Sequence, residues 1–339
     1  MHTPFRQSAD AATAAMRAVF PKTPLMRNAL LSAKYDADVW LKREDLSPVR
    51  SYKLRGAFNA MRKVIPAQSL FVCASAGNHA QGVAFMCKHF AVRGVIFMPV
   101  TTPAQKVMKT KMFGADHVEV RLVGDYFDQT LAESQEFCAQ AQGHFLSPFD
   151  DEDVIEGQAS VASEIFEQLG HAPDRIVLPV GGGGLSAGTR SYFGDTVDYT
   201  FVEPAGATSL AAAVAEGAPV DVSPISSFVD GAAVAKIGAR TFARLSDAAP
   251  EDVIALSEDR ICGTIVEMLN VEGIVLEPAG ALAIEALGEI AAQIKGKTVV
   301  AIASGGNFDF ERLPEVKERA QRYAGIKKYF ILRLPQRPG

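Results

Sequence analysis

One lysine stands in an unusual local setting. Residues 50–57 read RSYKLRGA, so Lys53 directly follows an aromatic residue, lies between two arginines and precedes small residues typical of a helix start. A lysine that acts as a nucleophile or a base must be partly neutral near pH 7. Burial and neighbouring cations, here Arg50 and Arg55, both lower the pKa of an ammonium group. A solvated basic turn fits the same eight residues. Other segments of the chain are therefore needed to choose between a reactive lysine and an exposed turn.

Four consecutive glycines follow an apolar run, in the segment GGGGLSAG at residues 181–188. So many glycines cost conformational entropy, but they are useful where backbone N–H groups crowd around an anion at a helix N-terminus. The loop therefore indicates a phosphate site. It also fits a dinucleotide fingerprint, because Gly182, Gly184 and Ala187 match G-x-G-x-x-A and Glu203 follows about twenty residues later. The loop alone leaves both interpretations open, although the second gives Lys53 no role.

Two further loops follow predicted strands. SAGNHAQG, at residues 75–82, opens a helical segment with Ser75, Gly77 and Asn78, so N–H groups and short polar side chains would face a ligand. SGGN, at residues 304–307, places Ser304 at the end of a strand with two glycines behind it, which lets a planar group approach the hydroxyl. Each loop by itself also fits an ordinary cap or turn.

Apolar, β-branched runs alternate with helical patterns along the chain. The predicted strands are VWLKRE, SLFVCAS, RGVIFMPV, ADHVEVRLV, DRIVLPV, DYTFVEP and KGKTVVAIAS. This order, over a length that suggests about two domains, predicts an α/β fold with mostly parallel, open twisted sheets flanked by helices. Ligands of such sheets bind at the carboxyl ends of the strands, which is where the three loops lie.

The composition excludes several classes of protein. The 339 residues carry a net charge of −5 without any run of like charges, so neither a nucleic-acid stripe nor a polybasic membrane anchor is present. No apolar stretch is long enough to span a bilayer, and the N-terminal segment is not a signal peptide. The four scattered cysteines include no CxxC pair. These features predict a soluble cytoplasmic protein.

Taken together and in this order, RSYKLRGA, SAGNHAQG, GGGGLSAG and SGGN resemble the fold-type II pyridoxal-phosphate-dependent enzymes. Within that group the chain is similar to the threonine dehydratases of the biosynthetic type, over nearly its whole length. The resemblance implies pyridoxal 5'-phosphate as the cofactor and Lys53 as the catalytic lysine that holds it covalently. It implies cofactor contacts from Tyr52, Lys53, Asn78, Gly181, Gly182, Gly183, Gly184, Leu185 and Ser304, and a substrate-carboxylate loop of Ser75, Ala76, Gly77, Asn78 and His79. Asn78 would bond the ring oxygen and Ser304 would face the pyridine nitrogen.

The resemblance also implies a domain organisation. A large cofactor-binding domain would consist of residues 1–42 and 148–325, with a small domain inserted at residues 43–147. Residues 326–339, which contain KKYFILRLP, resemble the first strand of the regulatory (ACT-like) domain that follows the catalytic domain in biosynthetic threonine dehydratases. Both domains would contain a helix-flanked, mostly parallel sheet.

The implied reaction is β-elimination of L-threonine to 2-oxobutanoate and ammonia, the first step of isoleucine biosynthesis, with Lys53 as general base. A dehydratase for L-serine or 3-hydroxyaspartate stays open as an alternative. From other classes, an NAD-dependent oxidoreductase using the glycine loop and a non-catalytic cofactor-binding protein also stay open. The family is commonly oligomeric, so a homo-oligomer, dimer or tetramer, is expected.

Two departures from related enzymes narrow the prediction. Serine racemases carry a second serine where this chain has Ala76, which disfavours a racemase. At the positions where related enzymes hold a divalent metal, Glu203 and Ala207 match, but Ser209 replaces an aspartate. We therefore expect no required divalent metal.

Overall fold

Two sheets organise the chain, for which a computed structural model describes residues 3–333. The first has six strands, in the order β1-β2-β10-β7-β8-β9, and is parallel except for the pair β1–β2. The second has four parallel strands, in the order β5-β4-β3-β6. In sheet order, the strands are β1 (Leu25–Arg27), β2 (Asp38–Arg43), β10 (Thr298–Ala303), β7 (Arg175–Pro179), β8 (Asp198–Pro204) and β9 (Val253–Leu256), then β5 (Val118–Leu122), β4 (Arg93–Met98), β3 (Leu70–Ala74) and β6 (His144–Phe145).

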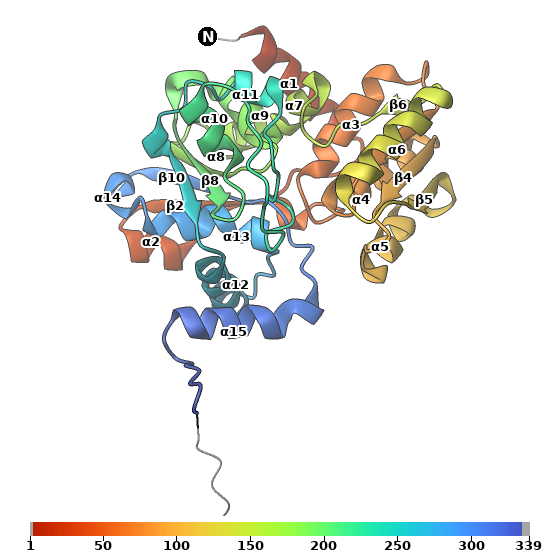
Figure 1. The fold of residues 1–339 in the computed structure, drawn as a ribbon. Helices are drawn as coiled ribbons and strands as arrows, with labels where there is room; N and C mark the ends of the chain where they lie inside the picture. Colours follow the sequence, from red (N-terminus) through yellow and green to blue (C-terminus); the bar gives the residue numbers. More distant parts are fainter. Residues whose placement is uncertain (1–2, 334–339) are drawn as a thin grey trace, which may run out of the picture.

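Figure 1 shows the two sheets side by side, each with its own helices. The four-stranded sheet is covered by α3 (Lys53–Val64), α4 (Asn78–Phe90), α5 (Ala104–Gly114) and α6 (Phe127–Gln140). The remaining α-helices are α1 (Pro4–Met16), α2 (Ala29–Tyr35), α7 (Glu152–Gln158), α8 (Ser160–Leu169), α9 (Gly184–Phe193), α10 (Ser209–Glu216), α11 (Ala239–Ala243), α12 (Glu258–Glu272), α13 (Pro278–Glu285), α14 (Ala291–Ile294) and α15 (Leu313–Tyr323). None of the helices in the described residues is long and apolar enough to cross a bilayer.

Both faces of each sheet are apolar, as the near-continuous hydrophobic runs require. In β3, Phe71 and Cys73 belong to the core shared with α3 and α4, whereas Val72 and Ala74 belong to the core on the α6 side. Successive side chains of a strand point to opposite faces, so one apolar run supplies two cores. The six-stranded sheet is likewise buried between two separate cores.

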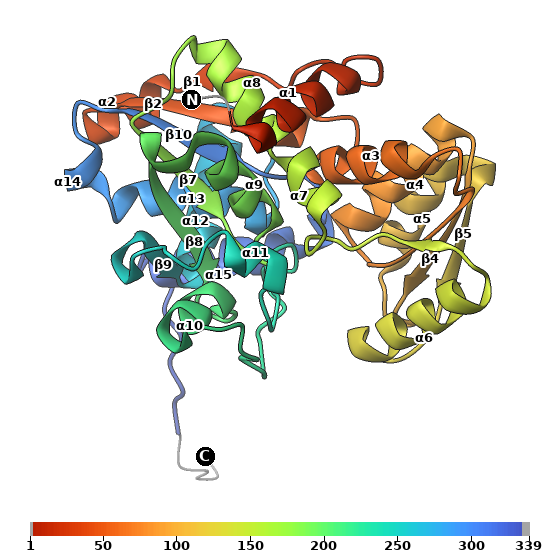
Figure 2. The same cartoon turned by 90° about the horizontal axis from the view of Figure 1, so that it is seen from above.

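The two parts meet at α3 and α7, which pack against each other between the sheets (Figure 2). Their backbones approach closely at glycines. A Cβ on Gly157 would lie 2.6 Å from the carbonyl oxygen of Arg55, and one on Gly56 would lie 2.4 Å from the Gln158 amide nitrogen. The first turn of α3, which begins at Lys53, is thereby held against the helices of the six-stranded sheet.

The predicted α/β fold with helix-flanked, mostly parallel sheets is confirmed. The seven predicted strands correspond to β2, β3, β4, β5, β7, β8 and β10. Strands β1, β6 and β9 were not predicted, and each contains only two to four residues. Segments that short cannot show a hydrophobic period, and only their neighbours in the sheet define them as strands.

The predicted division into domains remains a prediction. The chain leaves the six-stranded sheet after β2, builds the four-stranded sheet with β3 to β6, and returns at β7. Residues 326–333 contain neither helix nor strand, and the Ile331 side chain is 95% exposed. The strand expected there is therefore not formed in the described part, because a strand needs a neighbour to satisfy its backbone groups. Residues 334–339 of that predicted segment lie outside the described residues.

Candidate active site

The loop that follows β10 and helix α4, which comes after β3, both meet the start of α3. Ser51 forms an isolated β-bridge with Gly305, and the backbone N–H of Tyr52 donates to the Ser304 carbonyl at 3.3 Å. From the other sheet, α4 packs on the same turn, since a Cβ on Gly82 would lie 3.2 Å from the Leu54 nitrogen. Three of the four predicted motifs therefore converge, although they come from different parts of the chain.

The Lys53 side chain lies partly buried where these three segments meet. Its Nζ donates to the Pro148 carbonyl oxygen at 2.8 Å and lies 5.3 Å from the centre of the Tyr52 ring. Burial lowers the pKa of the Lys53 ammonium to about 8, partly opposed by the nearby Glu277 carboxyl. A lysine with this pKa has a useful neutral fraction near pH 7, as covalent and base chemistry require.

The expected role of the flanking arginines is wrong. Arg50 is exposed, in the left-handed backbone region with φ 57°. Arg55 is only 1% exposed, and its guanidinium forms ion pairs with Glu44 and Glu164. Burial, rather than cationic neighbours, depresses the Lys53 pKa. The sequence could not show this, because Arg55 and Glu164 are 109 residues apart in the chain.

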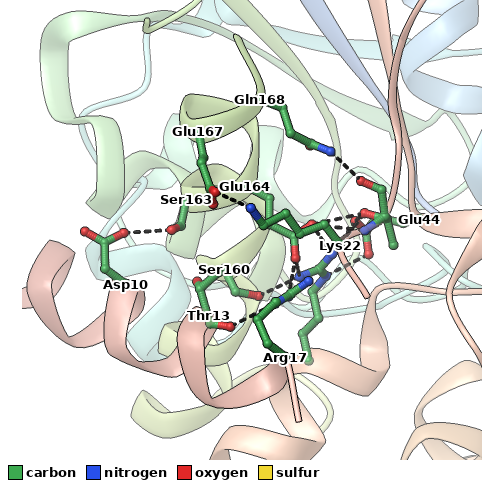
Figure 3. Close-up of polar contacts among 12 residues, drawn as sticks. Asp10, Thr13, Arg17, Lys22, Glu44, Ser160, Ser163, Glu164, Glu167 and Gln168 are labelled. Atoms are coloured by element: carbon green, nitrogen blue, oxygen red, sulfur yellow. Dashed lines mark hydrogen bonds and ion pairs between the residues drawn. The ribbon is translucent and has the colours of Figure 1, made fainter. Parts of the chain in front are cut away.

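The ion pairs of Arg55 belong to a buried polar network around Glu164. Figure 3 shows part of this network, with Glu164, Glu44 and Ser160 labelled. Glu164 of α8 also pairs with Lys42 of β2 at 2.6 Å, and both side chains are completely buried. The Arg55 guanidinium further donates to Ser160 and Thr23, each at 3.0 Å. The network therefore fixes the first turn of α3 to β2, to α8 and to the segment before β1.

The glycine loop forms a cradle at the N-terminus of α9. A Cβ on Gly182 would lie 2.1 Å from the Phe149 ring, and one on Gly181 would lie 3.0 Å from Ala232 Cα. Gly183 adopts φ 86°, which favours glycine. The first N–H groups of a helix have no partner within it, and α9 points them into this loop together with the positive end of its dipole. The residues present therefore fit a phosphate.

We predict that Gly182→Ala weakens cofactor binding and lowers stability by about 1–3 kcal/mol, because its methyl group would overlap the Phe149 ring. The measurement is a pyridoxal phosphate titration with a urea unfolding curve. Gly263→Ala in α12 is the matched control, because its Cβ would meet nothing within 4 Å and alanine suits a helix better than glycine. Equal behaviour of the two variants would contradict the cradle.

The predicted substrate loop lies at the N-terminus of α4. Ser75 Oγ accepts from the Gly77 N–H at 3.2 Å, and Asn78 is the first residue of the helix. The His79 imidazole is buried, contacts the Leu146 carbonyl at 3.0 Å, and has its pKa lowered to about 3 by burial and by Lys53. A neutral imidazole held in this way has a structural role, so His79 would contribute its backbone N–H. The assignment of residues 75–79 to the substrate remains a prediction.

Ser304 lies directly after β10, and its Oγ donates to the Ala279 carbonyl at 3.2 Å. To donate to a pyridine nitrogen, the hydroxyl would have to rotate away from Ala279, at the expense of one long hydrogen bond. A serine hydroxyl carries no charge, so it would leave such a nitrogen unprotonated.

Three residues of this candidate site were not predicted from the sequence: Glu277, Asn307 and Pro148. The Asn78 Nδ2 donates to Glu277 Oε1 at 2.6 Å, and the Asn307 Nδ2 donates to Asn78 Oδ1 at 2.7 Å. The sequence contained a feature that could have pointed to each of two of them. Glu277 begins the second of two EPAG segments, at 203–206 and 277–280, and Asn307 is the last residue of the SGGN motif. Pro148 had none, since it acts through its backbone carbonyl.

Glu203, the acidic residue that the dinucleotide-binding alternative requires for the ribose, is occupied elsewhere in the fold. Glu203 is fully buried, and its carboxylate accepts from the backbone N–H groups of Leu210 and Ala211 at 2.7 and 2.9 Å. These bonds cap the start of α10. The Glu203 side chain is therefore committed to the fold and does not reach outward to a ribose.

Known proteins extend this picture. The chain belongs to the pyridoxal-phosphate-dependent enzyme family, whose model matches residues 17–305. It is 46% identical over 332 residues to the biosynthetic L-threonine dehydratase IlvA of Lactococcus lactis, covering 96% of this chain and 80% of that protein. It is 45% identical over 322 residues to the same-named enzyme of Bacillus subtilis, covering 94% and 76%. Within the family the chain therefore belongs with the threonine dehydratases.

Solved structures agree with this placement. The processed form of threonine deaminase isoform 2 from Solanum lycopersicum superposes with a TM-score of 0.86 at 34% identity, covering 93% of each chain. A second solved threonine deaminase, from the organism abbreviated T.th., gives a TM-score of 0.82 at 28% identity, covering 90% of this chain and 98% of that one. The predicted family and cofactor are confirmed.

Proposed function

We propose that this chain is a threonine ammonia-lyase that converts L-threonine to 2-oxobutanoate and ammonia, the first step of isoleucine biosynthesis. The observation that carries the proposal is the partly buried Lys53, with its lowered pKa, whose Nζ bonds to Pro148; the next residue, Phe149, packs on the glycine loop that fits a phosphate. The similarity to biosynthetic L-threonine dehydratases supports the choice of substrate.

The residues of the site divide the work. Bound pyridoxal phosphate supplies an electron sink for negative charge at the substrate α-carbon. Lys53 Nζ, freed from the Pro148 carbonyl, takes the proton from that carbon as general base. The N–H groups at the start of α4 hold the substrate carboxylate and so orient the α-carbon toward Lys53. The sheets and helices around the site limit access of water.

Substrate preference provides a direct test. A steady-state comparison of kcat/KM for L-threonine, L-serine and 3-hydroxyaspartate should give the highest value for threonine. One methyl group in an apolar pocket is worth about 1–3 kcal/mol, so we expect serine to react about 10- to 100-fold more slowly. A higher kcat/KM for serine or 3-hydroxyaspartate would reassign the substrate within the same reaction. A failure to release any 2-oxo acid would reject the proposed function.

We further propose that the enzyme works in the cytoplasm as a homo-oligomer, either a dimer or a tetramer. The role of its relatives in biosynthesis supports the compartment. Light scattering on the purified chain measures the assembly directly, and a monomeric mass at micromolar concentration would contradict it.

A further inference from the structure

The Asn78 carboxamide is held from both of its ends. Its Oδ1 accepts from the Asn307 Nδ2 at 2.7 Å, and its Nδ2 donates to Glu277 Oε1 at 2.6 Å. The two partners come from the loop after β10 and from the residue that precedes α13, far from Asn78 in sequence. Neither partner was assigned a role in the cofactor site by the motifs.

A single backbone carbonyl fixes the direction of this series of bonds. The Val49 carbonyl oxygen can only accept, and it accepts from the Asn307 Nδ2 at 2.8 Å. That amide nitrogen has a second hydrogen, which points to Asn78, so the atom of Asn78 that faces it must be the oxygen. The Asn78 nitrogen then lies on the other side, where the acceptor is Glu277. One orientation of the Asn78 amide satisfies all three bonds.

Glu277 itself has little freedom to move. Glu277 is only 6% exposed, and its backbone N–H donates to the Gly305 carbonyl at 3.2 Å. A Cβ on Gly305 would lie 2.0 Å from Glu277 Oε1, so only glycine leaves room for the carboxyl group next to Ser304. The charged groups near Glu277 in the described residues include Lys53 as well as Asp230, Lys106 and Lys109. The carboxyl oxygen accepts from Asn78 whether or not Glu277 is protonated.

We propose that Asn307 and Glu277 are positioning residues that lock the Asn78 carboxamide in one orientation, so that its second N–H donates to the ring oxygen of pyridoxal phosphate. The inference rests on the proposed function, in which Asn78 contacts that oxygen. An Asn78 amide without these partners could present either its oxygen or its nitrogen to the cofactor. The oxygen would repel an ionised ring oxygen, whereas the N–H would stabilise it.

A double-mutant cycle tests the proposal. Asn307→Asp keeps the size of the side chain but replaces the donor with an acceptor, so the Asn78 amide should turn over. We expect about a tenfold rise in the Kd for pyridoxal phosphate and a shift of the visible absorbance maximum. In an Asn78→Ala background the same substitution should change neither quantity, because its effect passes through Asn78.

Substitutions of the two glutamates complete the experiment. Glu277→Gln can still accept from Asn78 through its Oε1, so the Kd should stay within about twofold of the original. Glu277→Leu cannot accept, and the Kd should rise about as much as in Asn307→Asp. Glu203→Gln is the matched control, because Glu203 belongs to the other EPAG segment, is also buried and bonds to the start of α10 instead of Asn78. It should leave the absorbance maximum unchanged.

The outcomes separate this inference from the proposed function. If the unmodified chain binds pyridoxal phosphate and releases 2-oxo acid, but the effects of Asn307→Asp and Asn78→Ala simply add, the positioning role is overturned. An unchanged Kd and spectrum in Asn307→Asp would overturn it as well. If the unmodified chain neither turns yellow with the cofactor nor produces 2-oxo acid, the proposed function is wrong. The positioning inference, which rests on that function, is then wrong as well.

Discussion

Replacement of Lys53 by alanine should abolish production of 2-oxobutanoate while leaving the fold intact. The substitution removes the amine that holds the cofactor and accepts the α-proton, and general-base catalysis alone contributes about 10²–10⁴-fold to rate. We therefore expect kcat to fall by more than about 10³-fold. The measurement is 2-oxo acid release from L-threonine, with the yellow absorbance of the cofactor as a second readout.

The direction in which Lys53→Ala changes the stability of the fold follows from the pKa of Lys53. In the folded, cofactor-free chain the Lys53 pKa is lowered to about 8 from 10.5, so the unfolded chain binds more protons between these values. The charged lysine therefore costs folding free energy below about pH 8, and this cost disappears as the pH rises toward 10.5. Lys53→Ala removes the cost, so its urea midpoint at pH 7 should equal or exceed that of the unmodified chain.

Lys88→Ala, at an exposed position of α4, is the control for removal of a lysine. It should retain full activity and nearly the same midpoint. Turnover of threonine by Lys53→Ala at a rate near that of Lys88→Ala would overturn the catalytic assignment.

Among the substitutions that we propose, Arg55→Ala should lower the free energy of unfolding the most. The Arg55 guanidinium pairs with Glu44 and Glu164, whose side chains are completely buried. Without it, Glu164 keeps Lys42 and the partly exposed Arg17 as partners, but the buried Glu44 keeps no ion pair among the described residues. Removal of one partner from a buried ion pair costs about 3–5 kcal/mol, because the other charge stays buried without compensation. Urea unfolding of the complete chain measures this cost.

Arg93→Ala is the matched control. Arg93 also forms an ion pair, with Glu119 at 2.9 Å, but these side chains are 60% and 43% exposed. Exposed pairs contribute about 0–1 kcal/mol, so we expect only a small change. If Arg55→Ala is no less stable than Arg93→Ala, the buried network does not hold the start of α3.

Acid should weaken the buried network. The Glu164 pKa lies well below its usual value because the attraction of Arg55 and Lys42 outweighs the effect of burial. A carboxyl group of this kind contributes stability above its unfolded pKa of about 4.5, and that contribution is lost as the pH falls through the lower, folded value. The difference in stability between the unmodified chain and Arg55→Ala should therefore be full at pH 7 and shrink in strong acid.

Much of the site follows from local patterns. A tetraglycine segment after a buried strand predicts an anion cradle by itself. The structure shows why glycine is needed there, because only glycine permits the contact of Gly182 with Phe149 and the backbone angle of Gly183. The order of four motifs specified the family and the cofactor. The strands with long apolar runs were also predictable, since their hydrophobic pattern is a property of consecutive residues.

Other features depend on residues that are distant in the chain. The setting of Lys53 looked cationic in the sequence, yet Arg55 points into a buried network with Glu164, and burial alone lowers the Lys53 pKa. Two EPAG segments are identical in sequence, but Glu203 caps a helix, whereas Glu277 bonds to Asn78. A tetrapeptide does not encode which groups the fold brings within hydrogen-bond distance.

The division between the two kinds of information has a physical cause. Backbone angles, hydrophobic periods and helix starts are set by neighbouring residues, so the sequence alone determined the α/β class and predicted the phosphate cradle and the role of Lys53. The protonation of buried groups and the direction of amide hydrogen bonds depend on dielectric surroundings and partners supplied by other segments. Only the tertiary structure could decide the roles of Arg55, Glu277 and Asn307.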